Sequence, residues 1–164
     1  MMKFSHIVIL FITFFASAGM AVSQTSSGTQ EYGDGGAYEG EFLNGLPHGN
    51  GTYELPNGYR YVGEWFEGEI NGQGEALFPN GSVYIGSFVK GKPEGSGKIT
   101  FTDGGTYEGE WANGSITGEG YAKYANGTTY QGTFLDAMHD GKGIMKSPDG
   151  YICLLYTSPS PRDR

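Results

Sequence analysis

Short runs in which large apolar and polar residues alternate return along the chain with a period of 23 residues. In the run that begins at Tyr38, the side chains of Tyr38 and Phe42 fall on one side of an extended backbone, and those of Glu39 and Glu41 fall on the other. Alternation with a period of two is typical of a β-strand that buries one face. Each run therefore predicts a strand with one aromatic face and one polar face.

A second alternating run follows a Gly-x-Gly pair in each unit. After Gly51 it places Tyr53 and Leu55 on one face, and the same positions later hold Ala76 and Phe78, Ile99 and Phe101, and Ala122 and Tyr124. Beyond residue 23, no helical period is longer than one turn. The expected fold class is all-β, an elongated single-layer antiparallel sheet of tandem 23-residue β-hairpin repeats. We expect about ten strands in a twisted, curved sheet.

Two aromatic positions recur in phase in all five units. Each unit opens on Tyr, and Phe or Trp follows four residues later. We call this set the aromatic ladder, and it comprises Tyr38, Phe42, Tyr61, Trp65, Tyr84, Phe88, Tyr107, Trp111, Tyr130 and Phe134. Stacked in register, these rings should form the core of the sheet. A single layer cannot cover both of its faces, so part of the ladder is also the candidate binding surface.

Glycine and proline also recur at fixed places. A glycine equivalent to Gly40 lies between the two rings of each unit, where a missing side chain leaves room for them. The Asn-Gly and Asp-Gly pairs that begin at Asn57, Asn80, Asp103, Asn126 and Asp149 predict tight turns. We interpret the Gly-x-Gly pairs as turn glycines too, and we expect turns at Pro47, Pro56, Pro79, Pro93 and Pro148.

The combined pattern Tyr-x-Gly-x-(Trp/Phe)-x-x-Gly, followed by Gly-x-Gly and Asn/Asp-Gly, closely resembles the MORN (membrane occupation and recognition nexus) repeat. The resemblance covers residues 38–152 as five units, 38–60, 61–83, 84–106, 107–129 and 130–152. It implies an elongated antiparallel sheet of successive hairpins that serves as an interaction platform. It implies no single activity, because these repeats occur both alone and attached to unrelated catalytic domains.

The N-terminal segment has the features of a secretory signal peptide over residues 1–23. Lys3 precedes an apolar run from Ile7 to Phe15, and small residues follow up to a cleavage site expected near Ser23-Gln24, with Ala21-Val22 as the other option. The alternative is an uncleaved membrane anchor, for which the apolar stretch of 16 residues from Ile7 to Val22 is short, because a spanning helix needs roughly 20. We therefore expect a secreted or periplasmic protein. Residues 24–37 combine a polar linker with the second half of an upstream unit, in which residues 28–35 would pair with the first full repeat.

The C-terminal segment, residues 153–164, breaks the repeat in mid-phase. Cys153 stands where the repeat would place Tyr, and no later residue fits the pattern. The string resembles the in-frame translation of a sequencing-library adapter, which predicts a non-native tail and a natural chain that continues differently after Ile152. The alternative is a natural disordered tail rich in Pro and Ser.

The charge of the tract between the two ends excludes some partners. Between residues 24 and 152 there are 7 Lys and Arg against 17 Asp and Glu, a net charge near −10. An acidic surface repels phosphates, so we expect no nucleic-acid partner, and no basic cluster is present to recruit anionic lipid.

Candidate chemistry is weak throughout the sequence. The stretch Gly86–Lys92 imitates a phosphate-binding loop, but Pro93 replaces the required Ser or Thr. The carboxylate pairs Glu39/Glu41 and Glu108/Glu110 should face solvent, and His48 and His139 are expected in loops four units apart, without further metal ligands nearby. The sequence therefore predicts no enzyme activity and no catalytic, cofactor-binding or metal-binding residue.

The leading hypothesis is a non-catalytic exported scaffold that mediates protein–protein interaction or self-association. A carbohydrate or cell-wall binding module is the first alternative, because Tyr and Trp rings can stack on sugars. The second is the targeting or regulatory arm of an enzyme whose catalytic domain lies beyond Ile152. Four N-glycosylation patterns begin at Asn50, Asn80, Asn113 and Asn126, and they arise wherever an Asn-Gly pair precedes Ser or Thr.

Overall fold

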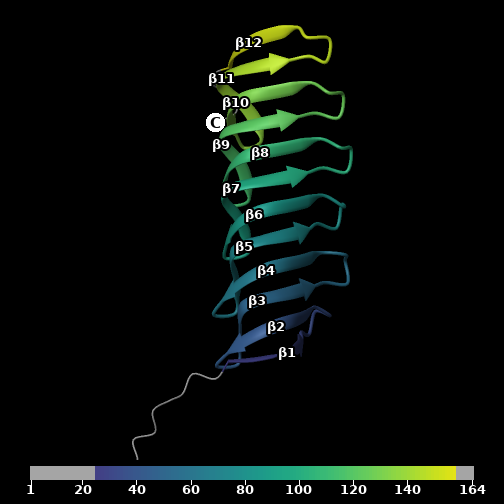
Figure 1. Ribbon diagram of the computed structural model, residues 1–164, viewed down its shortest axis with the longest axis vertical. Coiled ribbons are helices and arrows are strands. Elements are labelled where there is room, and N and C mark those ends of the chain that lie inside the picture. Colours follow the sequence, from purple (N-terminus) through teal and green to yellow (C-terminus); the bar gives the residue numbers. More distant parts are fainter. Residues whose placement is uncertain (1–24, 158–164) are drawn as a thin grey trace, which may run out of the picture.

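The computed structural model describes residues 25–157, so the expected signal peptide and the last seven residues lie outside the described part. These residues form one antiparallel sheet of twelve strands in which neighbours in sequence are neighbours in space (Figure 1). The strands are β1 (Thr25–Glu31), β2 (Ala37–Leu43), β3 (Leu46–Glu54), β4 (Arg60–Phe66), β5 (Glu69–Leu77), β6 (Val83–Val89), β7 (Lys92–Thr100), β8 (Thr106–Ala112), β9 (Ser115–Lys123), β10 (Thr129–Leu135), β11 (Met138–Lys146) and β12 (Ile152–Thr157). The all-β single-sheet prediction is confirmed.

Each unit is a hairpin whose seven-residue first strand and nine-residue second strand are joined by two residues. In the first unit these are Asn44 and Gly45, and both have positive φ, 53° and 82°. Two consecutive residues with positive φ define the type I′ turn, whose twist matches that of the flanking strands.

Five-residue loops connect one unit to the next, and here the predicted Asn-Gly and Asp-Gly turns are confirmed. Gly58 has a φ of 90°, and the Oδ1 of Asn57 accepts a hydrogen bond from the backbone N–H of Tyr59 at 2.9 Å. The N–H of Leu55 donates to the carbonyl of Tyr59 at 2.9 Å and closes the loop. Asn and Asp favour such loops because their side chains satisfy the backbone two residues later.

The Gly-x-Gly pairs lie in strands, so their assignment to turns was wrong. Gly49 and Gly51 belong to β3, and the register of β2 and β3 shifts between Gly40 and Phe42. This shift marks a β-bulge, and Gly49 beside it has a φ of 66°, a conformation that favours glycine. Gly51 instead pairs directly with Gly40 in the ladder. Every hairpin of the array repeats this arrangement.

Pro47 and Pro93 were expected in turns, and His48 and His139 in loops, but all four lie in strands. The carbonyl of Pro47 accepts a hydrogen bond from the N–H of Gly68 in the next hairpin tip at 2.8 Å. The backbone at this position therefore points out of its own hairpin ladder, where the missing N–H of proline removes no ladder hydrogen bond.

Two strands extend the array beyond the five full units. β1 pairs with β2 through Gly28 and Gly40, the register found between full units. β12 pairs with β11 so that Cys153 and Leu155 occupy the positions of the repeat Tyr and Gly. Backbone pairing does not depend on the identity of these side chains, and an adapter-derived origin of residues 153–164 stays a prediction.

The fifth unit departs from the repeat at its hairpin turn and provides a stability test. Ala137 replaces the usual glycine and has a φ of 62°. A left-handed conformation is costly for a residue with a Cβ, so Ala137→Gly should raise the unfolding free energy by about 1 kcal/mol. Urea unfolding measures this gain, and the reverse change at the equivalent Gly114 (φ 87°) should cost a similar amount. Equal stability of Ala137→Gly and wild type would contradict this explanation.

Candidate functional site

The tyrosine of each unit lies across a glycine of the neighbouring strand. In the third unit, a methyl group added at Gly97 would overlap the ring of Tyr84. The hydroxyl of Tyr84 donates to the carbonyl of Ser87 at 3.1 Å, which holds the ring against the strand at the bulge. Every unit forms the same bond to the residue three positions after its tyrosine. The glycine at this position of each unit thus leaves the space that the tyrosine ring occupies.

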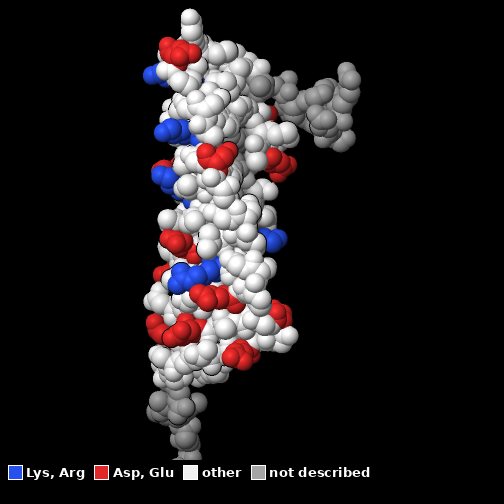
Figure 2. All heavy atoms as spheres, turned by 90° about the vertical axis from the view of Figure 1, so that its right-hand side faces the viewer, with Lys and Arg blue, Asp and Glu red and all other residues white. Residues whose placement is uncertain are grey.

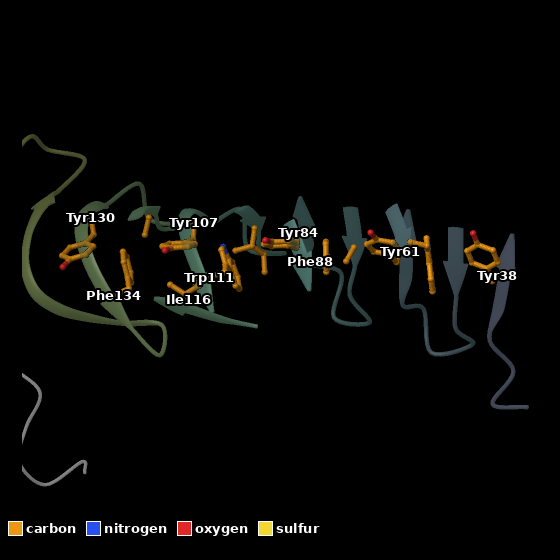
Figure 3. Close-up of a cluster of buried hydrophobic side chains, with 13 residues drawn as sticks. Tyr38, Tyr61, Tyr84, Phe88, Tyr107, Trp111, Ile116, Tyr130 and Phe134 are labelled. Carbon is orange, nitrogen blue, oxygen red and sulfur yellow. The ribbon is translucent and has the colours of Figure 1, made fainter. Parts of the chain in front are cut away.

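The Phe or Trp rings link these tyrosines into one continuous chain. Tyr84 meets Phe88 of its own unit edge-to-face at a centroid distance of 5.1 Å, and Trp111 of the next unit at 4.9 Å. The same contacts run from Phe42 to Phe134, and Figure 3 shows the buried rings from Tyr38 to Phe134. Each such pair contributes roughly 0.5–1.5 kcal/mol beyond its area burial. Neighbouring units are therefore joined by aromatic packing as well as by the backbone ladder.

The structure places the aromatic ladder in the core. Nine of its ten residues are buried and Phe42 is partly buried. The two tryptophans are each only 7% exposed. A sugar ring or a protein side chain cannot stack on the face of a ring that neighbouring units already cover, so the buried rings hold the fold together, and a binding role of the ladder stays a prediction.

The side chains opposite the ladder form what we call the outer face. Along β6, Ile85 follows the buried Tyr84 and points the other way, with 55% of its surface exposed. Its cross-strand neighbours are Glu75 on β5 and Lys98 on β7. Val62 and Leu77 are the other exposed apolar residues near it. The sequence analysis did not identify these exposed apolar residues as a group, although Val62 and Ile85 each directly follow the tyrosine of their unit.

One carboxylate of a predicted acidic pair has a structural role. The Oε1 of Glu41 accepts a hydrogen bond from the N–H of Asn50 at 3.2 Å, across the bulge. In the second unit, Glu64 accepts from the N–H of Gln73 at 2.7 Å. The bulge leaves backbone donors outside the regular ladder, and these carboxylates satisfy them. The sequence alone indicates only a solvated polar face at these positions.

The two histidines lie on β3 and β11, at opposite ends of the sheet, and are not brought together. His139 stacks on Tyr130 at a centroid distance of 3.6 Å, and its Nε2 lies 2.7 Å from the hydroxyl of Tyr124. Burial lowers the pKa of His139 below its usual 6.5. His48 packs against Phe66. His139 is thus held by ring stacking and by a hydrogen bond with Tyr124, and His48 by a ring contact.

Over residues 25–157, no group of three or more His, Cys, Asp or Glu could hold a metal ion. The same residues contain no helix with the length and apolar character needed to cross a membrane.

Buried tyrosines make the fold sensitive to alkali. Burial raises the pKa of both Tyr84 and Tyr107 from 10 to about 12. Above pH 10 the unfolded chain loses these protons while the folded chain keeps them, so the unfolding free energy should fall as pH rises from 10 to 12. Urea unfolding at stepped pH measures the slope. The Tyr84→Phe/Tyr107→Phe variant should show a shallower decline, and an identical slope in both proteins would contradict the assignment.

Comparisons with known proteins give a family and distant structural similarity. No curated protein matches the sequence. Among solved structures, the TCP domain of SAS-4 from Drosophila melanogaster, in complex with a proline-rich motif of Ana2, is 13% identical, with a TM-score of 0.44 over 91% of this chain and 99% of that one. The TCP10 domain of Danio rerio CPAP, in complex with a STIL peptide, is 16% identical, with a TM-score of 0.18 over 80% of this chain and 84% of that one.

The family comparison agrees with the repeat boundaries described above. The MORN repeat profile matches five successive segments, residues 38–58, 61–83, 84–106, 107–129 and 130–150. Each match begins at the tyrosine that lies over the paired glycines. The chain therefore belongs to the MORN repeat family.

Proposed function

We propose that this protein is a non-catalytic exported scaffold that mediates protein–protein interaction or self-association. The observation that carries the proposal is the outer face, where Val62 and Ile85 are 38% and 55% exposed on a sheet whose aromatic core lies on the other side. Exposed apolar side chains bordered by charges are typical of protein interaction surfaces.

The shape of the array supports the same function. Each unit contacts only its sequence neighbours, so the sheet presents a long face at fixed spacing (Figure 1). Arrays of this kind bind partners along an extended surface because adding units lengthens the surface without changing the core. The hollows on this sheet are open and shallow, and the one at its centre is lined by Ile85, Lys98 and glycine backbone. Such a surface suits a broad partner better than a small substrate.

Chemical cross-linking of the secreted protein, in the medium of the cells that produce it, tests the proposal. The full chain carrying a C-terminal tag should cross-link reproducibly either to a different protein or to a second copy of this chain. The Val62→Asp/Ile85→Asp variant should lose that product. Tyr151→Asp, in the loop between β11 and β12 and 80% exposed, serves as the control away from the outer face and should retain it. No cross-linked protein, or equal yield from wild type and Val62→Asp/Ile85→Asp, would refute the proposal.

Export is tested separately from binding. When the full chain is expressed with its own leader, the secreted product should begin near Gln24, as read by N-terminal sequencing. A product that stays in the cell with Met1 intact would remove export from the proposal and leave the interaction function standing.

A further inference from the structure

Charge is distributed unevenly along the array. Residues 25–77 contain nine Asp and Glu and one basic residue, Arg60, whereas residues 78–157 contain eight Asp and Glu and six Lys. Figure 2 shows the consequence on one side of the molecule, where acidic side chains dominate toward the N-terminal end and basic ones appear among them toward the other end. The two halves of the sheet therefore differ in net charge, about −8 against −2.

The outer face is self-complementary around Ile85. In the ladder, Glu75 pairs with Ile85 on one side and Lys98 pairs with it on the other, so an acid, an apolar side chain and a base stand in a row across β5, β6 and β7. A two-fold axis that runs along β6 in the plane between two facing sheets places Ile85 against its own copy. The same operation places Glu75 of each copy over Lys98 of the other.

We propose that the outer face binds a second copy of this chain, face to face and with the two arrays antiparallel, about a two-fold axis at Ile85. This inference rests on the proposed interaction function and names its partner. Isologous contact is the commonest way for a protein to form a dimer, because one surface serves both subunits. The antiparallel direction brings each strongly acidic half over the lysine-bearing half of the other copy. Parallel arrays would place the two acidic halves together.

The local structure leaves these groups available. The side chain of Lys98 is 52% exposed, and its intrachain partner Glu108 lies 3.7 Å away and is 69% exposed. An exposed ion pair of that length contributes little free energy, so breaking it when Lys98 turns toward a second copy costs little. Leu77 and Val83, on the strands that carry Glu75 and Ile85, pair with each other and extend the apolar centre.

The area suits a dimer of moderate affinity. Twelve strands spaced about 4.8 Å apart and about 23 Å long give an outer face near 1,200 Å². Facing sheets pack with their strands rotated by about 30°, so the central strands overlap and the ends diverge. The contact then approaches the roughly 800 Å² per partner of an ordinary interface.

Sedimentation velocity on the full chain, up to about 100 μM, tests the proposal. The wild type should dimerise, and Ile85→Asp should be monomeric, with circular dichroism confirming that it folds. Glu75→Lys and Lys98→Glu alone should each raise the dimer dissociation constant at least about tenfold. An equimolar mixture of these two single variants should dimerise again, because each copy then meets the opposite charge. Tyr151→Asp, in the loop between β11 and β12, is the control for added charge and should dimerise like the wild type.

The outcomes separate this inference from the proposed function. A wild type that stays monomeric at every concentration overturns the dimer. A cross-link to a different protein would still support the scaffold function. A dimer that neither single charge reversal weakens, or that mixing fails to restore, overturns the two-fold geometry at Ile85. Absence of both dimer and cross-linked partner removes the inference and the proposed function together.

Discussion

Gly97→Ala should lower the unfolding free energy by about 3 kcal/mol or more, one of the two largest effects expected of any single substitution. The added methyl group would occupy the space of the Tyr84 ring. The ring cannot move aside, because Tyr84 is fully buried between Phe88 and Trp111 and its hydroxyl is bonded at the bulge. Chemical denaturation monitored by tryptophan fluorescence measures the loss.

Gly28 provides the matched control for this substitution. It occupies the same repeat position on β1, but no tyrosine ring lies across it, and an added methyl group would meet only Phe42 at an ordinary 3.8 Å. Gly28→Ala should therefore leave stability within about 0.5 kcal/mol of the wild type, since alanine also loses less backbone entropy than glycine. If both alanine variants were equally unstable, backbone conformation rather than ring packing would explain the glycines.

Tyr84→Ala should cost about 3–5 kcal/mol, the range for truncating a large buried aromatic residue. Tyr84 is fully buried and joins the third unit to the fourth through Trp111. In an array stabilised by nearest-neighbour contacts, a central defect divides the sheet into two blocks that unfold separately. Native-state hydrogen exchange should show strands β1–β5 and β8–β12 keeping more protection than β6 and β7.

Two further variants identify the origin of that loss. Tyr84→Phe keeps the ring contacts and removes only the hydroxyl bond to Ser87, so it should cost about 1 kcal/mol. Tyr130→Ala removes an equally buried ring from the last full unit and should affect protection mainly in β10–β12. Uniform loss of protection across all strands in either alanine variant would show that the array unfolds as one cooperative unit instead.

The period of 23 residues made the hairpin array predictable. Tyr38 and Phe42 alternate with Glu39 and Glu41, and an alternation of period two fixes which side chains share a face. The turn at Asn57 and Gly58 was equally readable, because an Asn-Gly pair combines a capping side chain with a residue that accepts positive φ. Both signals depend only on residues close together in the chain, so they can be recognised in a single sequence.

The roles of the Gly-x-Gly pairs could not be read in the same way. Gly49 has positive φ beside a bulge, and Gly51 lies in a strand under a tyrosine ring, yet both are glycines in one short motif. Glycine indicates only that a side chain is absent. Whether the reason is a turn, a bulge or a close neighbour depends on the strand opposite, which the motif does not contain.

The sequence by itself determined the repeating hairpin, the identity of the aromatic ladder and the acidic balance of the chain. Only the tertiary structure decided that the ladder is covered by its neighbours and that Ile85, between Glu75 and Lys98 on the outer face, stays exposed. The physical reason is that burial and cross-strand neighbours belong to pairs of units in register. Alternation within one strand specifies which side chains share a face, but only stacking determines which face stays in contact with water.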